Sequence, residues 1–275
     1  MKARRIIGVL FLFMGAACLI FAVLQLKKYQ EGNEEYQNIV AEYVQEPEDG
    51  DEDDFYLDWD SLYAQNQDLV GWIRMAPSVC YPIVRADNNS FYLHHGFQKT
   101  YNINGAIMMN CYNSPDWSDK NTVVYGHNMN NGSMFGSNKK YMDQSYTKKH
   151  PYFYIYTKDG RLTYRIFETM VVHDDSRPFE TQFTDDAAFG KYLDDIRPKR
   201  DYDLGVSVSE KDQIVTLSTC TRNGTMRFLI QGRLESFRDW QGNTITVEQA
   251  RERQLQEEKM EETRVTESDQ NLDTD

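Results

Sequence analysis

The chain has 275 residues, of which 40% are hydrophobic and 27% are charged, so most of it is neither disordered nor built of several membrane spans. The 43 acidic side chains outnumber the 30 basic ones and give a net charge of −13, which argues against nucleic acid as a partner because phosphate binding needs a basic surface. The four cysteines include no C-x-x-C pair, which excludes a zinc ribbon and a disulfide-dense scaffold; we expect neither a metal nor a cofactor.

The N-terminus predicts a membrane anchor. Residues 1–5 are rich in Lys and Arg, and the apolar run from Ile6 to Leu24 that follows is long enough to cross a bilayer as one helix. The basic residues favour a cytoplasmic N-terminus, so we assign 1–5 to the cytoplasm and 6–26 to a single-pass anchor. A cleaved signal peptide is the alternative, although no small-x-small cleavage site follows the run.

Two acidic segments flank the part that is expected to fold. Residues 27–57 end in a strongly acidic stretch, 46–54, and their composition predicts a solvated linker. The alternating aspartates of this stretch resemble a calcium loop, but the glycine and the final glutamate of an EF-hand are missing. Residues 237–275 form an acidic tail in which Thr246 is expected to cap a short helix, and we assign this tail no chemistry.

Residues 58–236 alternate aromatic and β-branched runs with turn residues, and they are predicted to form the folded domain. We expect one helix over Asp60–Trp72 and a second over Asp185–Ile196, with Thr184 as the cap of the second. Many strands and few helices indicate a mainly antiparallel barrel or sandwich. The expected strands are Tyr81–Arg85, Ala106–Met109, Thr122–Tyr125, Tyr152–Thr157, Leu162–His173, Gln213–Thr219 and Thr225–Leu234.

The last two strands flank Asn223–Gly224, and an Asn-Gly pair is a strong signal for a two-residue hairpin turn. In that register Cys220 lies directly opposite Arg227 on the same face, with Cβ atoms about 5 Å apart. Arg233 lies about 20 Å farther along the same strand. A cation beside a thiol favours the nucleophilic thiolate, and a guanidinium can donate hydrogen bonds to an oxyanion. For an arbitrary cysteine, a buried packing role is the alternative.

A thiol nucleophile also needs a group that exchanges protons, and five histidines are available. His127 follows the strand 122–125 after one glycine, so it lies at a strand end, where a rigid scaffold commonly presents reactive groups. The chemistry alone places it only slightly ahead of the others. The remaining four are expected to pack, to face solvent or to form ion pairs: His94, His95, His150 and His173.

The segment Thr216–Cys220, which reads Thr-Leu-Ser-Thr-Cys, and the following Arg227–Ile230 resemble the signature of the sortase family. Together with Tyr-Gly-His-Asn-Met at Tyr125–Met129, they are most similar to class B. The resemblance covers roughly residues 58–236. Further similar segments are Gly71–Ile73, Tyr81–Val84, Asp87–Asn88, Tyr92–His95 and Gly132–Gly136.

The resemblance implies an eight-stranded sortase-type β-barrel with added helices, held at the cell membrane of a Gram-positive bacterium with the catalytic domain outside. It implies a cysteine transpeptidase in which Cys220 is the nucleophile, His127 the acid and base, and Arg227 the stabiliser of oxyanion or substrate. Ser218 is a further candidate for substrate contact, and a strand hydroxyl without a role is its alternative. Some class B members carry an acid directly after the nucleophile; here Thr221 stands there, so the role of that acid does not transfer.

The implied substrate is a secreted protein whose C-terminal sorting signal resembles N-P-x-T-x and is cleaved after its threonine. The implied acceptor is an amine of a peptidoglycan precursor or of a pilin-like protein. Two other interpretations stay open. One is an L,D-transpeptidase-like cell-wall enzyme, which shares Cys-x-Arg but has Ser-His-Gly before the cysteine. The other is a non-catalytic, membrane-tethered binding module whose Cys220 is buried.

Overall fold

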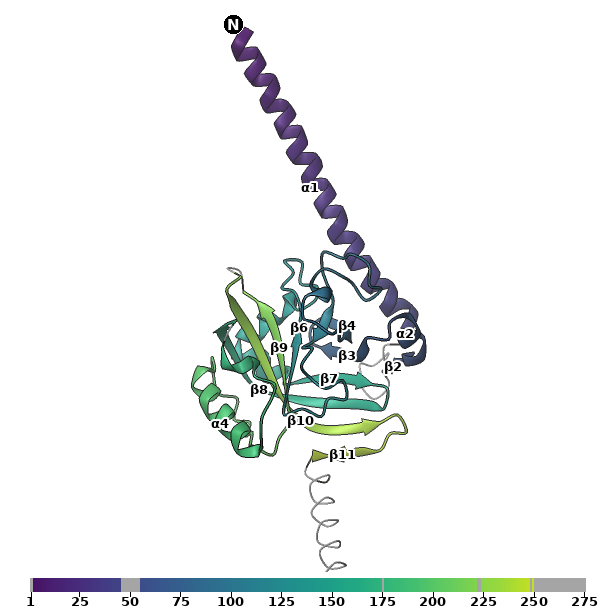
Figure 1. Cartoon of the computed structure of the whole chain (residues 1–275), viewed down its shortest axis with the longest axis vertical. Helices are drawn as coiled ribbons and strands as arrows, with labels where there is room; N and C mark the ends of the chain where they lie inside the picture. Colours follow the sequence, from purple (N-terminus) through teal and green to yellow (C-terminus); the bar gives the residue numbers. More distant parts are fainter. Residues whose placement is uncertain (1, 46–54, 175, 222–223, 248, 250–275) are drawn as a thin grey trace, which may run out of the picture.

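A closed β-barrel forms the body of the protein, and one long helix projects from it (Figure 1). The computed structural model describes residues 2–45, 55–174, 176–221, 224–247 and 249. The barrel strands are β3 (Leu69–Met75), β4 (Val79–Val84), β5 (Ile107–Met109), β6 (Asn121–Tyr125), β7 (Tyr152–Thr157), β8 (Gly160–His173), β9 (Ile214–Cys220) and β10 (Met226–Asp239).

Within the described residues these strands follow the order β10-β8-β7-β3-β4-β5-β6-β9, and pairing of β9 with β10 closes the barrel. Only β4–β5 and β6–β9 are parallel pairs, so the predicted eight-stranded, mainly antiparallel barrel is confirmed. Branched and aromatic side chains fill the interior, as strand segments with two covered faces require. Core residues that are at most 1% exposed include Trp72, Ile83, Val124, Phe153, Ile155, Tyr164 and Leu217.

The predicted helix Asp60–Trp72 is wrong in its second half. Helix α2 (Trp59–Gln65) covers only the first part, and the chain then turns into strand β3. Trp72 lies in the middle of this strand, pairs with both β4 and β7, and is fully buried. A short apolar run that is buried on both faces looks the same in a helix and in a strand, so hydrophobic periodicity alone did not distinguish them.

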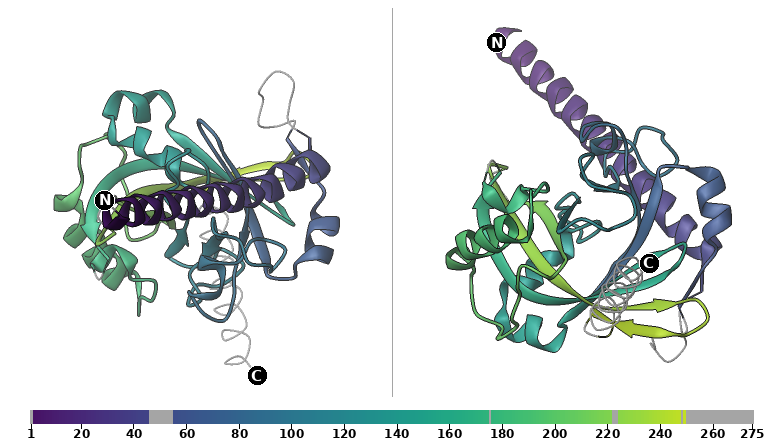
Figure 2. Two further views of the ribbon diagram at one scale, coloured as in Figure 1. Left: turned by 90° about the horizontal axis from the view of Figure 1, so that it is seen from above. Right: turned by 60° about the horizontal axis from the view of Figure 1, so that its bottom comes forward.

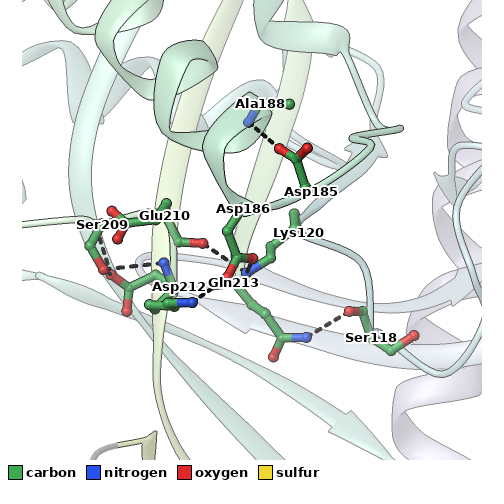
Figure 3. A network of polar contacts seen from close by, with 10 residues as sticks. Ser118, Lys120, Asp185, Asp186, Ala188, Ser209, Glu210, Asp212 and Gln213 are labelled. Atoms are coloured by element: carbon green, nitrogen blue, oxygen red, sulfur yellow. Dashed lines mark hydrogen bonds and ion pairs between the residues drawn. The ribbon is translucent and has the colours of Figure 1, made fainter.

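Helix α4 (Asp186–Ile196) is fixed to the barrel by the network of polar contacts in Figure 3. Asp185, rather than the predicted Thr184, caps the helix, because its carboxylate accepts a 2.8 Å hydrogen bond from an amide of the first turn. The Asp186 carboxylate accepts hydrogen bonds from Lys120 and Lys211 at 2.7 and 2.6 Å. These bonds lower the pKa of Asp186 to about 2. The network therefore ties α4 to the residue that directly precedes β6.

Helix α1 (Lys2–Tyr43) is long and apolar enough to cross a membrane. The most apolar window of 18 residues within Leu10–Tyr43 has a mean hydropathy of 2.1, and none of it is buried. The N-terminal, apolar half of α1 projects away from the barrel, while its C-terminal half runs along the barrel surface (Figures 1 and 2).

The structure differs from the solvated linker that was expected over 27–57. Tyr36 and Ile39 are only 3% and 2% exposed against the barrel, and the Tyr36 hydroxyl donates a 2.5 Å hydrogen bond to the Gly105 carbonyl. The apolar residues of this segment recur every three or four positions, which gives the helix a packing face. The helix is followed by β1 (Val44–Gln45), which pairs with β2 (Tyr56–Leu57), and the acidic stretch 46–54 lies outside the described residues.

The folded domain also extends past the expected boundary at residue 236. Strand β10 continues to Asp239 and pairs with β11 (Thr244–Thr246). The Thr246 hydroxyl accepts a 3.2 Å hydrogen bond from the Gln249 amide, as the predicted cap requires. Residues 250–275, which hold the rest of the acidic tail, lie outside the described part of the chain. A short helix α3 (Gln144–Lys149) precedes β7.

We expect Tyr36→Ala to lower the free energy of unfolding by about 3–5 kcal/mol, as loss of a buried aromatic ring does. The ring packs edge-to-face on Tyr81 with centroids 5.4 Å apart, in addition to its bond with Gly105. Urea unfolding of the full-length protein in detergent measures the effect. Tyr29→Ala is the matched control, because Tyr29 lies on the same helix and is 38% exposed. Equal losses in both variants would contradict the docking of α1.

Glu168 on β8 predicts a pH-dependent stability. It is 3% exposed, and burial raises the pKa of its carboxyl to about 7 against the opposing charges of Arg200 and Arg197. The folded state therefore binds this proton more tightly than the unfolded chain, whose Glu pKa is near 4.5. The stabilising contribution is complete below pH 4.5 and is lost as the pH rises through 7.

Glu168→Gln should accordingly flatten the fall in unfolding free energy between pH 5 and pH 8 by up to about 3 kcal/mol. Urea titrations of the two proteins at both pH values provide the comparison. Glu210→Gln serves as the control, since Glu210 is exposed. An unchanged slope in Glu168→Gln would show that this carboxyl titrates normally.

Candidate active site

The predicted hairpin register is confirmed, and it places a thiol beside a guanidinium. β9 and β10 pair antiparallel with Cys220 directly opposite Arg227. Directly opposed residues of an antiparallel pair share a face, so both side chains lie on the same side of the sheet. Arg233 pairs with Ile214 at the other end of β9, about 20 Å away at the rise of a strand.

The turn of this hairpin has the backbone geometry that glycine favours. Gly224 has a φ of 74°, in the left-handed region where a side chain is strained. Its amide donates a 3.0 Å hydrogen bond to the Thr221 carbonyl, and the Thr221 amide donates to the Met226 carbonyl at 2.9 Å. Residues 222–223, which include the predicted turn residue Asn223, lie outside the described residues.

A second strand pairing brings the imidazole to the same place. β6 lies beside β9 (Figure 1) and runs parallel to it. Tyr125 at the end of β6 pairs with Ser218. His127 follows Tyr125 by two residues and Cys220 follows Ser218 by two, so both lie two residues beyond the last pair. The Asn128 side chain donates a 2.7 Å hydrogen bond to the Cys220 carbonyl and holds the two strand ends together.

The three predicted catalytic residues, Cys220, His127 and Arg227, line one cavity of about 320 Å³. Cys220 is partly exposed, so its thiol is not sealed in the core as the binding-module interpretation requires. The cavity is also lined by Asn89, Leu93, Ala106, Met108, Tyr125, Gly126, Asp174, Phe179, Ser218 and Thr219. Phe179 lies in the connection from β8 to α4, and this segment is held by the buried Asn121, whose side chain donates to the Glu180 carbonyl at 2.8 Å.

His127 is oriented by a backbone carbonyl. Its Nε2 lies 2.8 Å from the carbonyl oxygen of Leu93, and because this oxygen only accepts, Nε2 carries a proton in this arrangement. A side chain at Gly105 would lie 2.8 Å from the same carbonyl and 3.0 Å from the imidazole Cδ2, and the φ of Gly105 is 59°. Because Nε2 of His127 is occupied by the Leu93 carbonyl, Nδ1 is the ring nitrogen that is available to a reacting group.

Asp174 is a residue of the site that the sequence analysis missed. The Arg227 guanidinium donates to the Asp174 carboxylate at 3.2 Å and to the Gly224 carbonyl at 2.7 Å. Asp174 directly follows β8, and β8 pairs with β10 so that Val172 opposes Arg227. Only knowledge of this long-range pairing would have placed the carboxylate beside the guanidinium.

Ser218 and Tyr125 present hydroxyls to the cavity. Ser218 is 2% exposed, and its Oγ has no hydrogen-bond partner among the described residues. Burial raises the pKa of Tyr125, whose hydroxyl accepts a 2.9 Å hydrogen bond from the side chain of Asn110, so this phenol stays neutral at physiological pH. An unpaired buried hydroxyl that faces a cavity is suited to bind a peptide group.

The other histidines have the packing and ionic roles that were expected of them. His95 stacks on Phe91 with ring centroids 4.1 Å apart, and His173 lies 3.1 Å from the Asp174 carboxylate. His94 stacks loosely on His127 at 6.4 Å. Within the part of the chain that the structure describes, no cluster of three His, Cys, Asp or Glu side chains could hold a metal ion.

Comparisons with known proteins show the family to which the chain belongs. The model of the sortase domain family matches residues 79–235. Sortase B of Listeria monocytogenes is 36% identical over 180 residues, which cover 63% of this chain and 72% of that protein. Sortase B of Staphylococcus aureus is 26% identical over 223 residues, which cover 80% and 91%. A crystal structure of sortase B from Bacillus anthracis superposes with a TM-score of 0.66 at 30% identity, over 76% of this chain and 98% of that one.

The eight-stranded barrel, the match to the sortase domain family and the sortase B relatives together define a cysteine transpeptidase of the sortase type. The chain belongs to the sortase family, and its relatives place it in class B.

Proposed function

We propose that this class B sortase cleaves a C-terminal sorting signal resembling N-P-x-T-x after its threonine and joins the threonine carbonyl to an amine. The observation that carries the proposal is the arrangement of Cys220, His127 and Arg227 around one cavity. The sortase family acts on proteins with sorting signals and on peptidoglycan, which supports this substrate class.

In the first step the Cys220 thiolate attacks the threonine carbonyl, and a bond forms between Sγ and the carbonyl carbon. Arg227 stabilises the negative charge that develops on the carbonyl oxygen. The bond between carbonyl carbon and amide nitrogen then breaks, and His127 donates a proton to the departing amine. The products are a thioacyl enzyme and the released end of the sorting signal.

In the second step an acceptor amine attacks the thioacyl carbon while His127 takes up its proton. The C–S bond breaks, and Cys220 leaves as thiolate. The new amide links the surface protein to the acceptor, which is a peptidoglycan precursor or a pilin-like protein. Ser218 binds the peptide backbone of the sorting signal through its unpaired hydroxyl.

In this proposal the apolar half of α1 spans the cell membrane with the N-terminus in the cytoplasm and the barrel outside. The basic N-terminal residues and the exposed apolar surface of the helix support this orientation. The enzyme then works where secreted proteins leave the membrane.

The test is to incubate the full-length protein in detergent with a library of sorting peptides and a set of candidate amines. Mass spectrometry should show cleavage after threonine in N-P-x-T-x-like peptides and a new amide to one class of amine. Cleavage at another position, or cleavage of unrelated peptides at equal rates, would contradict the proposed specificity.

A further inference from the structure

Cys220 lines two hollows in the surface. One is the cavity of about 320 Å³ that also holds His127 and Arg227, which we call the peptide cavity. A second cleft of about 630 Å³ is lined by Cys220, Thr219 and Thr221 of β9 and its end, and by Asn128, Lys139, Met142 and Phe228. We call it the acceptor cleft. A third hollow of about 690 Å³, the helix cleft, lies between the C-terminal half of α1 and the barrel. Lys139 lines both of these clefts.

The charge of the two clefts contrasts with that of the whole chain. The protein has a net charge of −13, yet neither cleft is lined by a described Asp or Glu, whereas Lys139 and Lys140 line the helix cleft. Lys139 is exposed and forms no ion pair with the described residues. The peptide cavity, by comparison, contains Asp174 beside Arg227. The surface that joins α1 to the thiol is therefore selectively cationic.

Two buried hydroxyls in these clefts lack partners. Ser137 lines the helix cleft and is 6% exposed. Thr219 is 4% exposed and lines both the acceptor cleft and the peptide cavity. The hydroxyl oxygens of Ser137 and Thr219 both lack a hydrogen-bond partner among the described residues. A buried hydroxyl without a partner costs free energy, and a bound ligand that accepts a hydrogen bond from it removes this cost.

We infer that the acceptor amine reaches the thioacyl enzyme through the acceptor cleft, and that Lys139 binds an anionic group of the acceptor, a phosphate or a carboxylate. This inference rests on the proposed function, because it concerns the second step of that reaction. The sorting peptide fills the cavity on one side of Cys220, and the acceptor occupies the cleft on the other. The helix cleft runs beside α1, so an acceptor carried on a membrane lipid would meet Lys139 on its way to the thiol.

The experiment separates acceptor binding from acylation in the full-length protein in detergent. A sorting peptide is supplied at saturation, and three amines compete with water for the thioacyl enzyme: triglycine, its neutral amide, and triglycine coupled to phosphoethanolamine. The ratio of aminolysis to hydrolysis gives the apparent KM of each amine. Release of the leaving peptide without acceptor gives the acylation rate. Wild-type enzyme is compared with Lys139→Ala and Lys139→Glu.

We expect Lys139→Glu to raise the apparent KM of the anionic amines by about tenfold and to leave the neutral amide nearly unaffected, as loss of one charge-assisted hydrogen bond does. Lys148→Glu is the matched control, because Lys148 is exposed on α3 and lines none of these clefts. An effect on the phosphate amine alone identifies phosphate as the ligand, and an effect on triglycine alone identifies a carboxylate.

Equal KM values for all three amines in wild type and in both Lys139 variants would overturn the inference. A shift of the same size in Lys148→Glu would also overturn it, because a general change of surface charge would then explain the result. An enzyme that fails to release the leaving peptide would instead contradict the proposed function, so the two failures are distinguishable.

Discussion

Cys220→Ala should abolish thioacyl formation, and with it both cleavage of the sorting peptide and transfer to an amine. No other described side chain of the cavity is a nucleophile of comparable strength, since a thiolate attacks a carbonyl far more readily than a hydroxyl does. Release of the leaving peptide, followed by chromatography, measures the effect. The barrel should stay folded, because the partly exposed thiol contributes little to the core.

Cys111→Ala is the matched control for this prediction. Cys111 is also a free and partly exposed cysteine, but it does not line the cavity that holds Cys220. Its backbone amide donates a 2.8 Å hydrogen bond to the Asn89 side chain. We expect this variant to retain turnover close to that of the wild type. Residual cleavage by Cys220→Ala, or its loss in Cys111→Ala, would assign the nucleophile to a different residue.

Arg227→Ala should lower turnover by about 10²–10³-fold, the usual effect of removing one donor from an oxyanion site. The guanidinium lies in the cavity with Cys220, held by Asp174 and the Gly224 carbonyl, so its loss removes positive charge where negative charge develops. Saturating peptide cleavage kinetics measure kcat directly. The expected loss lies in kcat more than in KM, because the charge exists only in the transition state.

Arg233→Ala provides the contrast on the same strand. Its guanidinium donates to the Ser207 carbonyl at 2.9 Å and lies 3.5 Å from the Glu235 carboxylate, far from the thiol. We expect a modest loss of stability and nearly unchanged kcat for the folded protein. Equal losses of kcat in both arginine variants would contradict the strand register as the source of the catalytic geometry.

The local part of this site was predictable from the sequence, because a tight turn fixes the register of the strands that it joins. The Asn-Gly pair before Thr225 sets Cys220 opposite Arg227 without any knowledge of the fold. His127 was only one of five candidates on chemical grounds. Its place beside the thiol depends on the parallel pairing of β6 with β9, two strands that are far apart in the sequence.

Other features depended on contacts that no local pattern reveals. Asp174 reaches Arg227 only because β8 pairs with β10. The first part of β3, up to Trp72, was read as helix because both faces of this strand are largely buried. The docked half of α1 was missed for a different reason. Its polar composition resembles a linker, and only the barrel surface that Tyr36 and Ile39 contact makes it an ordered helix.

The most direct test of the catalytic arrangement is to trap the acyl group on the full-length protein with an N-P-x-T-x-like peptide at acidic pH, where thioesters hydrolyse slowly. Proteolytic digestion and mass spectrometry then locate the adduct. We predict a thioester on Cys220. We also predict that this thioester accumulates only when both His127 and Arg227 are present. An acyl group on any other residue, or undiminished acylation of Cys220 in His127→Ala and Arg227→Ala, would contradict the account.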